Sequence, residues 1–381
     1  MATATQDGEP LRIVHVTFDM RIGGTEQVIR NLIEGSDPGR FTHRIFCIEE
    51  PIGPWGVALQ NNGVALESHQ RRPAFDTSVL RALRSYLRRT KADVVHCHQY
   101  TPWTYGALAA LGLKTRVVFT EHGRFYPDRS SPKRRFVNPL LERLTDQITA
   151  ISEATRAALV DFEFLRGDRI QVVYNGIRGL EVDARDSTQL RSKLGIPADA
   201  PVLGTIARFD PIKNHAMMLR AFRLVLDQHP DCRLILVGDG EERGNIEALI
   251  ADLGIARSIV LPGYVPKPDM WLAIMDVFLL SSFSEGTSMT LLEAMSLGKP
   301  CVVTSVGGNP EIVLDRQSGT VTPSDQAQPF ADAISELLNN HGLLSRLGQG
   351  ASDRFSDRFT YEHLVESYAG VYARTCATQA H

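Results

Sequence analysis

The feature that most constrains the fold of this chain is the alternation of short apolar runs with longer amphipathic segments. The run "LRIVHVTF" (Leu11–Phe18) has the composition of a buried strand, and a glycine turn and a helical pattern of apolar residues follow it. The same succession returns at five further runs: "HRIFCI", "ADVVHCH", "TRVVFTEHG", "QITAIS" and "IQVVYNG". Strands that alternate with helices in this way predict an α/β fold, with a parallel sheet covered by helices on both faces.

A polar stretch rich in glycine and proline, Asn175–Pro201, interrupts the alternation and predicts a domain junction. A second α/β series follows it, with strand candidates "VLGTIAR", "CRLILVGDG", "SIVLPG", "DVFLLSS" and "PCVVTSV". From about Asp325 the chain has helical patterns only. We therefore predict domains over residues 1–180 and 200–358 and a final helix within 359–381. Two such domains usually leave a cleft that binds ligands.

Composition excludes several classes of protein. The 381 residues carry a net charge of −3, which gives no footprint for nucleic acid. The five cysteines are odd in number and widely spaced, which argues against a disulfide framework and favours a reducing cytoplasm. The polar start "MATATQDGEP" does not resemble a signal peptide, and no apolar run approaches the ~18 residues of a membrane span. We expect contact with a membrane, if any, from its surface.

The stretch "FSEGTSMTLLEAMSLGKP" places Glu285 and Glu293 around a small, hydroxyl-rich turn that opens a helix ending at Gly298. A strand, a turn and a helix in succession leave free amides at the helix N-terminus, and these suit a phosphate group. Close approach and added hydroxyl bonds would come from the small residues of the turn and helix start: Gly286, Thr287, Ser288 and Thr290. The alternative is a solvated glutamate beside an ordinary helix cap.

A diphosphate also needs positive charge, and "IARFDPIKNH" supplies Arg208 and Lys213 after a strand end. Solvated loop cations are the alternative for this pair. The turn "LVGDGEER" has two glycines but lacks the full G-x-G-x-x-G spacing, so it is a poor dinucleotide motif.

The first domain offers weaker candidates. Gly23 and Gly24 follow the first strand and permit close approach of a ligand, or form a plain tight turn, and Thr25 can cap the next helix. In "FTEHGR", His122 stands at a strand end, where it either binds substrate or has a structural role. The pair His96 and His98 shares one strand face, but a metal site needs more ligands than the nearby sequence provides, so no metal site is predicted.

Together these stretches resemble family-4 glycosyltransferases, which are retaining enzymes of the GT-B fold. The likeness covers nearly the whole chain and is strongest in "GTIARFDPIKNH", "LVGDGEER", "LPGY" and "SSFSEGTSMTLLEAMSLGKPCVVTSVGGNPEIV". It implies two Rossmann-like domains facing across a cleft, with the last helix returning to the N-terminal domain. The C-terminal domain would bind a nucleotide sugar and the N-terminal domain an acceptor.

The resemblance also implies residue roles. Arg208 and Lys213 would hold the diphosphate and stabilise the leaving group, Glu285 would bind hydroxyls of the donor sugar, and Glu293 would bind the ribose. His122 would approach the sugar near its C6 hydroxyl. The predicted catalytic residues are Arg208, Lys213, Glu285 and His122. The other donor contacts would be Gly24, Gly263, Tyr264, Gly286, Thr287, Ser288, Met289 and Thr290. Neither a metal nor another cofactor is expected, since the cations and the helix start stabilise the charge.

The predicted donor is a UDP- or GDP-sugar and the predicted acceptor a glycan or polyprenyl-diphosphate-linked hydroxyl. Many relatives have an apolar residue at the position of Thr287, so sugar specificity does not transfer. Clustered basic residues of the N-terminal domain are either a solvated face or a docking surface for anionic lipid or acceptor: Arg71, Arg72, Arg81, Arg84, Arg88, Arg89, Lys133, Arg134 and Arg135. Two rival functions remain: a nucleotide-sugar epimerase or hydrolase on this fold, and a non-catalytic sugar-nucleotide-binding subunit.

Overall fold

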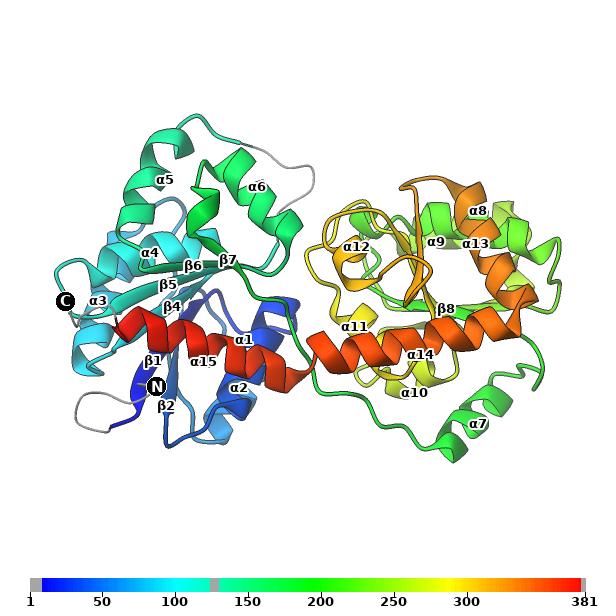
Figure 1. The fold of residues 1–381 in the computed structure, drawn as a ribbon, viewed down its shortest axis with the longest axis horizontal. Coiled ribbons are helices and arrows are strands. Elements are labelled where there is room, and N and C mark those ends of the chain that lie inside the picture. The colour runs from blue at the N-terminus through cyan, green and yellow to red at the C-terminus, as the bar shows by residue number, and fades with distance from the viewer. Residues whose placement is uncertain (1–8, 124–129, 378–381) are drawn as a thin grey trace. The chain divides into compact units, whose positions relative to one another are not determined.

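The computed structural model describes residues 9–123 and 130–377, and it divides the chain into two compact units (Figure 1). Unit 1 comprises Met1–Gly176 and Tyr361–His381, and unit 2 comprises Ile177–Thr360. Residues 1–8, which belong to the start that does not resemble a signal peptide, lie outside the described residues, as do residues 124–129.

Unit 1 is built on a seven-stranded parallel sheet in the order β3-β2-β1-β4-β5-β6-β7. The strands are β1 (Leu11–Thr17), β2 (Phe41–Cys47), β3 (Ala65–Ser68), β4 (Val94–His98), β5 (Arg116–Glu121), β6 (Gln147–Ala150) and β7 (Ile170–Val172). The helices are α1 (Gly24–Gly35), α2 (Pro54–Asn61), α3 (Thr77–Arg89), α4 (Tyr100–Ala110), α5 (Arg134–Arg143), α6 (Glu153–Glu163), the 3-10 turn η1 (Gly167–Arg169) and α15 (Tyr361–Ala377). The predicted parallel sheet is confirmed, and the short edge strand β3 is added to it.

Helices cover both faces of this sheet (Figure 1). One face packs on α3, α4 and α5, where Trp103 stacks on Phe119 at 4.3 Å and donates its indole N–H to Thr145 at 2.8 Å. The opposite face, which includes His15 and His96, packs on α1 and α15. Helix α1 begins at Gly24 with Gly23 as its cap and no side-chain cap, so the predicted capping role of Thr25 is wrong. Thr25 is instead buried within the helix, where its hydroxyl accepts from Gln99 at 3.3 Å.

The final helix belongs to unit 1, although unit 2 precedes it in the sequence. Two tyrosines of α15 hold it to the sheet through buried hydrogen bonds. The hydroxyl of Tyr372 bonds to His96 Nδ1 at 2.8 Å, and that of Tyr368 bonds to Thr120 Oγ1 at 3.1 Å. The predicted return of the last helix to the N-terminal domain is therefore confirmed.

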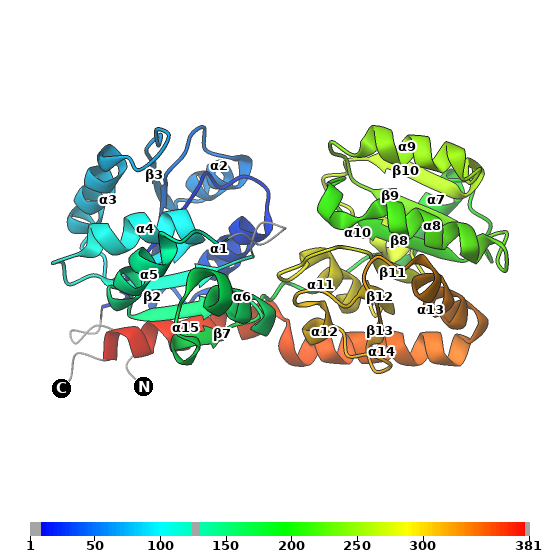
Figure 2. The same cartoon turned by 90° about the horizontal axis from the view of Figure 1, so that it is seen from above.

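Unit 2 is built on a six-stranded parallel sheet in the order β10-β9-β8-β11-β12-β13 (Figure 2). The strands are β8 (Val202–Ile206), β9 (Arg233–Val237), β10 (Ile259–Gly263), β11 (Val277–Leu280), β12 (Cys301–Thr304) and β13 (Gly319–Thr322). The helices are α7 (Ala184–Lys193), α8 (His215–Leu226), α9 (Arg243–Asp252), α10 (Asp269–Ala273), α11 (Met289–Ser296), α12 (Asn309–Ile312), α13 (Ala327–Asn339), α14 (His341–Arg358) and the 3-10 turns η2 (Pro211–Lys213) and η3 (Ala256–Ser258). Strand β13 is the second short edge strand that the sequence analysis missed.

The core of unit 2 lies between the sheet and the helices α8, α9 and α13, and it includes Phe222 and Phe330. On the other face α11 packs on α14. Strands β8 and β11 are neighbours in the middle of the sheet. The loops that follow them, to α8 and to α11, therefore lie side by side at the carboxyl edge, which is where open parallel sheets bind ligands.

Candidate active site

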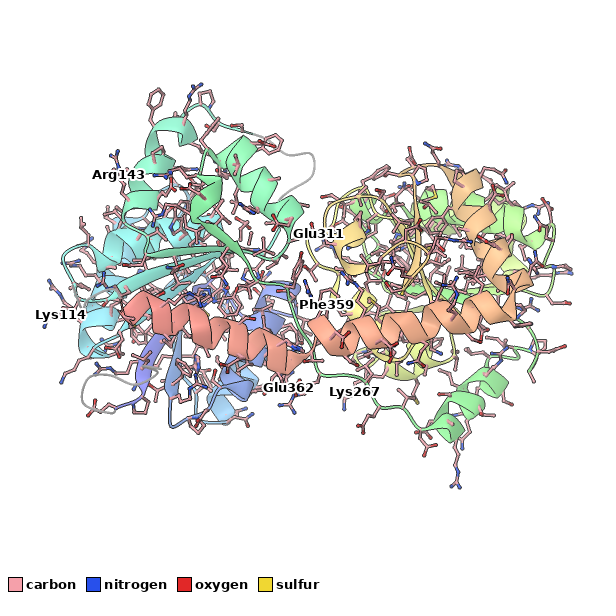
Figure 3. All side chains as sticks on the ribbon, in the orientation of Figure 1. Lys114, Arg143, Lys267, Glu311, Phe359 and Glu362 are labelled. Atoms are coloured by element: carbon pink, nitrogen blue, oxygen red, sulfur yellow. The ribbon has the colours of Figure 1, made fainter. Side chains whose placement is uncertain are left out.

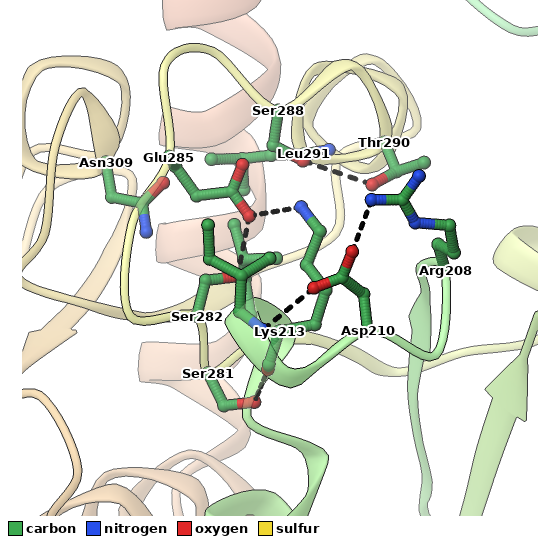
Figure 4. Close-up of polar contacts among 12 residues, drawn as sticks. Arg208, Asp210, Lys213, Ser281, Ser282, Glu285, Ser288, Thr290, Leu291 and Asn309 are labelled. Atoms are coloured by element: carbon green, nitrogen blue, oxygen red, sulfur yellow. Dashed lines mark hydrogen bonds and ion pairs between the residues drawn. The ribbon is translucent and has the colours of Figure 1, made fainter. Parts of the chain in front are cut away.

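An ion pair joins the two loops at the carboxyl edge of the unit 2 sheet. Lys213, at the end of η2, donates from Nζ to Glu285 Oε1 at 2.6 Å (Figure 4). The Glu285 side chain is 7% exposed and that of Lys213 is 23% exposed. The fold thus brings together two residues that lie 72 positions apart and that sequence analysis assigned to one site.

Glu285 is fixed from several sides. Its Oε1 also accepts from the Ser282 hydroxyl at 2.6 Å, and its backbone carbonyl accepts from the Gly308 amide at 3.1 Å. Gly307 lies so close that a Cβ there would stand 1.8 Å from the Glu285 carbonyl oxygen, and its φ is +49°. Only glycine fits such a position. The "VGGNP" turn therefore sets the place of the Glu285 backbone.

The loop after β8 is also held in place. The Phe283 amide donates to the Ile212 carbonyl at 2.8 Å, which ties the two loops together. Asp210 accepts from the Ile212 amide at 3.0 Å and forms an ion pair with Arg208. Burial acts to raise the pKa of Asp210, but these hydrogen bonds outweigh it, and the pKa is lowered. The Arg208 side chain is 74% exposed, so its guanidinium remains accessible.

The helix start predicted for phosphate binding is present. Helix α11 begins at Met289, and the side chain of its cap, Ser288, accepts from the Leu291 amide at 3.3 Å. The first bond of the helix runs from the Leu292 amide to the Ser288 carbonyl at 3.3 Å. The amides of Met289 and Thr290 precede that bond and have no partner within the helix. They are the donors that the helix geometry offers to an anion.

Glu293 lies one turn inside α11. Burial, together with the carboxylate of Asp269, raises the pKa of Glu293 to about 7. A carboxyl group near this value exists in both protonation states at neutral pH, so it can accept or donate a hydrogen bond to a hydroxyl group.

The predicted base contacts lie at the end of β10. Gly263 has a φ of +81°, and Tyr264 is 60% exposed. The glycines of "LVGDG" have a packing role, since a Cβ at Gly238 or Gly240 would meet the carbonyl oxygen of Ala207 or Phe209 at 1.9 or 2.3 Å. That turn therefore supports the loop that carries Arg208.

Two predicted site residues, Gly24 and His122, lie in unit 1. Gly24 is the first residue of α1, and a Cβ added there would meet nothing within 4 Å. Neither packing nor a positive φ requires glycine at this position, so its role in binding a ligand stays a prediction. His122 directly follows β5, and burial lowers its pKa to about 3, so its ring is neutral. Its Nδ1 is buried without a hydrogen-bond partner among the described residues.

Comparisons with known proteins identify the family of this chain. The model for glycosyl transferases group 1 matches residues 186–354, and the model for glycosyltransferase family 4 matches residues 22–178. The chain is 31% identical over 366 residues to a lipopolysaccharide core biosynthesis glycosyltransferase, LpsE, of Rhizobium meliloti, an alignment that covers 95% of this chain and 99% of LpsE.

The chain belongs to glycosyltransferase family 4.

This glycosyltransferase has the GT-B fold of its structural neighbours. Anabaena Alr3699/HepE in complex with UDP superposes with a TM-score of 0.85 at 20% identity, covering 96% of this chain and 100% of that one. An N-acetyl-alpha-D-glucosaminyl L-malate synthase of Bacillus anthracis is 28% identical over 305 residues, which are 79% of each chain. No helix within residues 9–123 and 130–377 of the glycosyltransferase is both long and apolar enough to cross a membrane.

The sequence analysis of this glycosyltransferase missed three residues that shape the site. Asp210 pairs with Arg208, Ser282 holds Glu285, and Gly307 fixes its backbone. Ser282 and the "VGGNP" turn were part of the quoted family resemblance. Ser282 bonds to Glu285 within one loop, whereas the close approach of Gly307 to Glu285 depends on the pairing of β11 with β12. The position of Gly307 in the sequence does not indicate this contact.

Proposed function

We propose that this glycosyltransferase moves a hexose from a UDP- or GDP-sugar, with retention at the anomeric carbon, to a hydroxyl of a glycan or lipid-linked acceptor. The work would take place in the cytoplasm, in polysaccharide or glycolipid assembly. The observation that carries the proposal is the Lys213–Glu285 pair beside the start of α11. It places a cation, a carboxylate and free helix amides at one edge of the sheet.

In the proposed step, the bond from the anomeric carbon to the diphosphate oxygen breaks and a bond to the acceptor oxygen forms. Negative charge grows on the departing nucleoside diphosphate, and the acceptor proton passes to one of its oxygens. Lys213, Arg208 and the α11 amides would stabilise that charge. Because these donors stand in fixed positions, no metal ion is required for this role, and we propose none.

Glu285 and Asp210 already form ion pairs with the cations that would bind the diphosphate. A diphosphate at this place would compete with Glu285 for Lys213 and with Asp210 for Arg208. Glu285 released in this way would be free to accept from sugar hydroxyls, while Ser282 keeps its carboxylate in place. The ion pair thus couples arrival of the diphosphate to the sugar-binding role of Glu285.

The nucleotide is tested by thermal denaturation with UDP, GDP, ADP and their sugars, with EDTA present throughout. A bound ligand stabilises the native state in proportion to the logarithm of its concentration over Kd. We expect one base to raise the melting temperature and the raise to survive EDTA. A raise that needs added divalent cation would contradict the metal-free proposal.

The role of Lys213 is tested by Lys213→Ala, with Lys193→Ala on the exposed helix α7 as the matched control. Loss of one charge-stabilising donor should lower turnover by at least ~10²-fold, while the control keeps the wild-type rate. Near-normal turnover of Lys213→Ala would remove this residue from the mechanism. Donor hydrolysis or a free epimer as the main product, without acceptor, would favour the epimerase or hydrolase.

Contact with an anionic membrane surface, where a lipid-linked acceptor resides, is the second part of the proposal. Helix α5 presents an apolar stripe to solvent, with Phe136 80%, Val137 46% and Leu140 56% exposed. Exposed basic residues, Lys133, Arg135 and Arg143, accompany the stripe, and Figure 3 marks Arg143 at the helix end. An apolar stripe with basic flanks is the pattern of helices that lie in a lipid interface.

The arginines on and before α3 are less suited to this role, because partners within unit 1 occupy several of them. Arg71 pairs with Glu49 at 2.8 Å, Arg72 with Asp76 at 3.1 Å and Arg89 with Glu67 at 2.5 Å. Arg84 donates to two backbone carbonyls. Of the basic cluster seen in the sequence, α5 and its flanks are therefore the proposed docking surface.

Sedimentation with lipid vesicles tests that surface. The wild type should bind vesicles with anionic lipid more tightly than zwitterionic ones, since each basic residue near an anionic surface contributes about 1 kcal/mol. Phe136→Asp should weaken binding by at least ~10-fold, whereas Leu111→Asp, at a 55% exposed position outside α5, should not. Equal binding of all three proteins would rule out α5 as the docking element.

A further inference from the structure

Four histidines form a diagonal row across the unit 1 sheet, on the face covered by α1 and α15. His43 of β2 is paired with Ile13 of β1, and His15 lies two residues beyond Ile13. His15 is paired with His96 of β4, and His98 lies two residues beyond His96. His98 is paired with Thr120 of β5, and His122 lies two residues beyond Thr120. Each step of two residues keeps the side chain on the same face, so the row advances towards the carboxyl edge.

Ring nitrogens join the row into a continuous chain of hydrogen bonds. His43 Nδ1 and His15 Nε2 are 2.9 Å apart, and His15 Nδ1 and His98 Nε2 are 3.0 Å apart. His98 Nδ1 and His122 Nε2 are 2.8 Å apart. At the two ends, His43 Nε2 and His122 Nδ1 are buried and have no partner among the described residues.

The rings of the row are neutral at neutral pH. Burial lowers the pKa of His43 to about 4 and that of His122 to about 3, and it lowers those of His15 and His98 well below 6.5. A neutral imidazole has one N–H donor and one acceptor nitrogen. Each of the three contacts therefore uses one donor and one acceptor.

This requirement links the tautomers of all four rings. Every contact joins an Nδ1 to an Nε2, so a ring that donates from Nδ1 must receive at Nε2. The protons then all stand on Nδ1, with His122 Nδ1 as a donor at the carboxyl edge. In the reverse direction they all stand on Nε2, and His122 Nδ1 is an acceptor.

We infer that His98, His15 and His43 are positioning residues that fix the ring orientation of His122 and tie its tautomer to their own, so that its Nδ1 donates to the donor sugar in one direction of the row and accepts from it in the other. The contact between His122 and the sugar rests on the proposed function above. The row itself rests on the register and the nitrogen distances alone. A partner that fixes an imidazole tautomer is known to matter where the other nitrogen binds a ligand.

A metal site is the competing interpretation, because ligand atoms of His15, His96 and His98 lie within 4.8 Å of one another. Both nitrogens of His96 are already bonded, to Tyr372 at 2.8 Å and Thr120 at 2.6 Å. A cation would replace these bonds and the His15–His98 contact, and zinc sites usually need a fourth ligand. The row needs no further group inside the sheet, so the geometry favours it.

The tautomers are measured by NMR of the enzyme labelled with 15N-histidine, after dialysis against EDTA at neutral pH. Single-histidine variants assign the ring signals. The expected result is one tautomer shared by His43, His15, His98 and His122. Mixed tautomers among the four rings of the wild-type enzyme would overturn the proposal. Uptake of stoichiometric Zn²⁺ with shifts of His15, His96 and His98 would overturn it in favour of the metal site.

The positioning role is measured with His98→Leu, which removes the partner of His122, and His98→Gln, whose amide can replace it. His98→Leu should change the chemical shifts of the His122 ring nitrogens. It should also lower kcat or raise the donor KM by on the order of 10-fold. His98→Gln should restore the chemical shifts and the kinetics in part. His69→Gln, a histidine of unit 1 outside the row, should change neither. Wild-type kinetics in His98→Leu would overturn the positioning role.

The two levels of the proposal fail separately. Mixed tautomers in an enzyme that binds and turns over nucleotide sugar would refute the positioning role of the row and leave the proposed function intact. A chain that binds no nucleotide sugar would end the proposed function, and the wild-type tautomers would still decide whether the row exists.

Discussion

Acidification should destabilise unit 1, because its buried histidines must stay neutral for it to fold. His15, His96 and His98 are fully buried, and burial lowers the pKa of each well below 6.5. Unfolding returns them to water, where the unfolded chain binds protons that the folded chain does not. The stability from these rings is therefore complete above pH 6.5 and is lost as the pH falls towards their folded pKa values.

The loss in the free energy of unfolding follows from the number of buried histidine rings. Each pH unit below 6.5 costs about 1.4 kcal/mol for each ring that stays neutral in the fold. At pH 5 one ring costs about 2 kcal/mol and the three together about 6 kcal/mol. His43 and His122 act in the same direction, and the raised pKa of partly buried Glu26 offsets part of the loss. Domains are stable by about 5–15 kcal/mol in total, so unit 1 should be close to unfolding at pH 5.

In unit 2, Glu293 contributes a dependence on pH of the opposite sign. Its folded pKa, about 7, lies above its usual value of 4.5 because of burial and Asp269. Its contribution is present in full below pH 4.5 and is lost as the pH rises through 7. Acidification from pH 7.5 to 5 should therefore gain about 2 kcal/mol from Glu293. Buried His215, also in unit 2, offsets this gain, because burial lowers its pKa to about 4 and its ring must stay neutral in the fold.

Differential scanning calorimetry at pH 7.5, 6 and 5 measures both effects. We expect the unit 1 transition to fall steeply with acid and the unit 2 transition to hold. Glu293→Gln removes the contribution that offsets His215, so it should make the second transition fall with acid and so assign it to unit 2. A unit 1 transition that is as stable at pH 5 as at pH 7.5 would refute the reasoning, since the buried rings would then be charged or solvated in the folded state.

Three further predictions follow from single contacts. Gly307→Ala, whose Cβ would meet the Glu285 carbonyl oxygen at 1.8 Å, should destabilise unit 2 by about 1–3 kcal/mol and lower turnover. The control Gly244→Ala, whose Cβ meets nothing within 4 Å, should stabilise unit 2 by up to about 1 kcal/mol. Urea unfolding measures both changes, and equal effects of the two variants would contradict the close approach at Gly307. Tyr372→Phe removes the hydroxyl bonded to His96 at 2.8 Å and should cost about 1–3 kcal/mol by the same assay; no change would mean that this bond does not hold α15. Glu285→Ala should lower turnover and broaden the choice of donor sugar, and an unchanged donor profile would take Glu285 out of the sugar site.

Much of the fold could be predicted because the central strands and the helix ends have local sequence patterns of their own. Buried strands such as Leu11–Thr17 are continuous apolar runs, and glycine ends such as Gly298, with a φ of +64°, mark helix ends. The strands β3 and β13 were missed because "ALES" and "GTVT" are only four residues long and are polar or glycine-containing. Edge strands of this kind lack the apolar run that identifies central ones.

In the candidate site, too, local motifs could be predicted and contacts between strands could not. Lys213, Glu285 and the start of α11 could be assigned to one site, because each motif has its own chemistry and its own strand end. The histidine row could not be predicted, although His96 and His98 were noted. Their partners His15 and His43 come from other strands, and only the register of the sheet shows that the four rings meet.

The central claim is that a nucleoside diphosphate binds at the start of α11 with Lys213 as its cation. The most direct test is a crystal structure with the nucleotide that thermal denaturation selects, grown in EDTA. The account predicts diphosphate oxygens within hydrogen-bond distance of Lys213 Nζ and of the Met289 and Thr290 amides. A diphosphate bound elsewhere on unit 2, with the Lys213–Glu285 pair undisturbed, would contradict it.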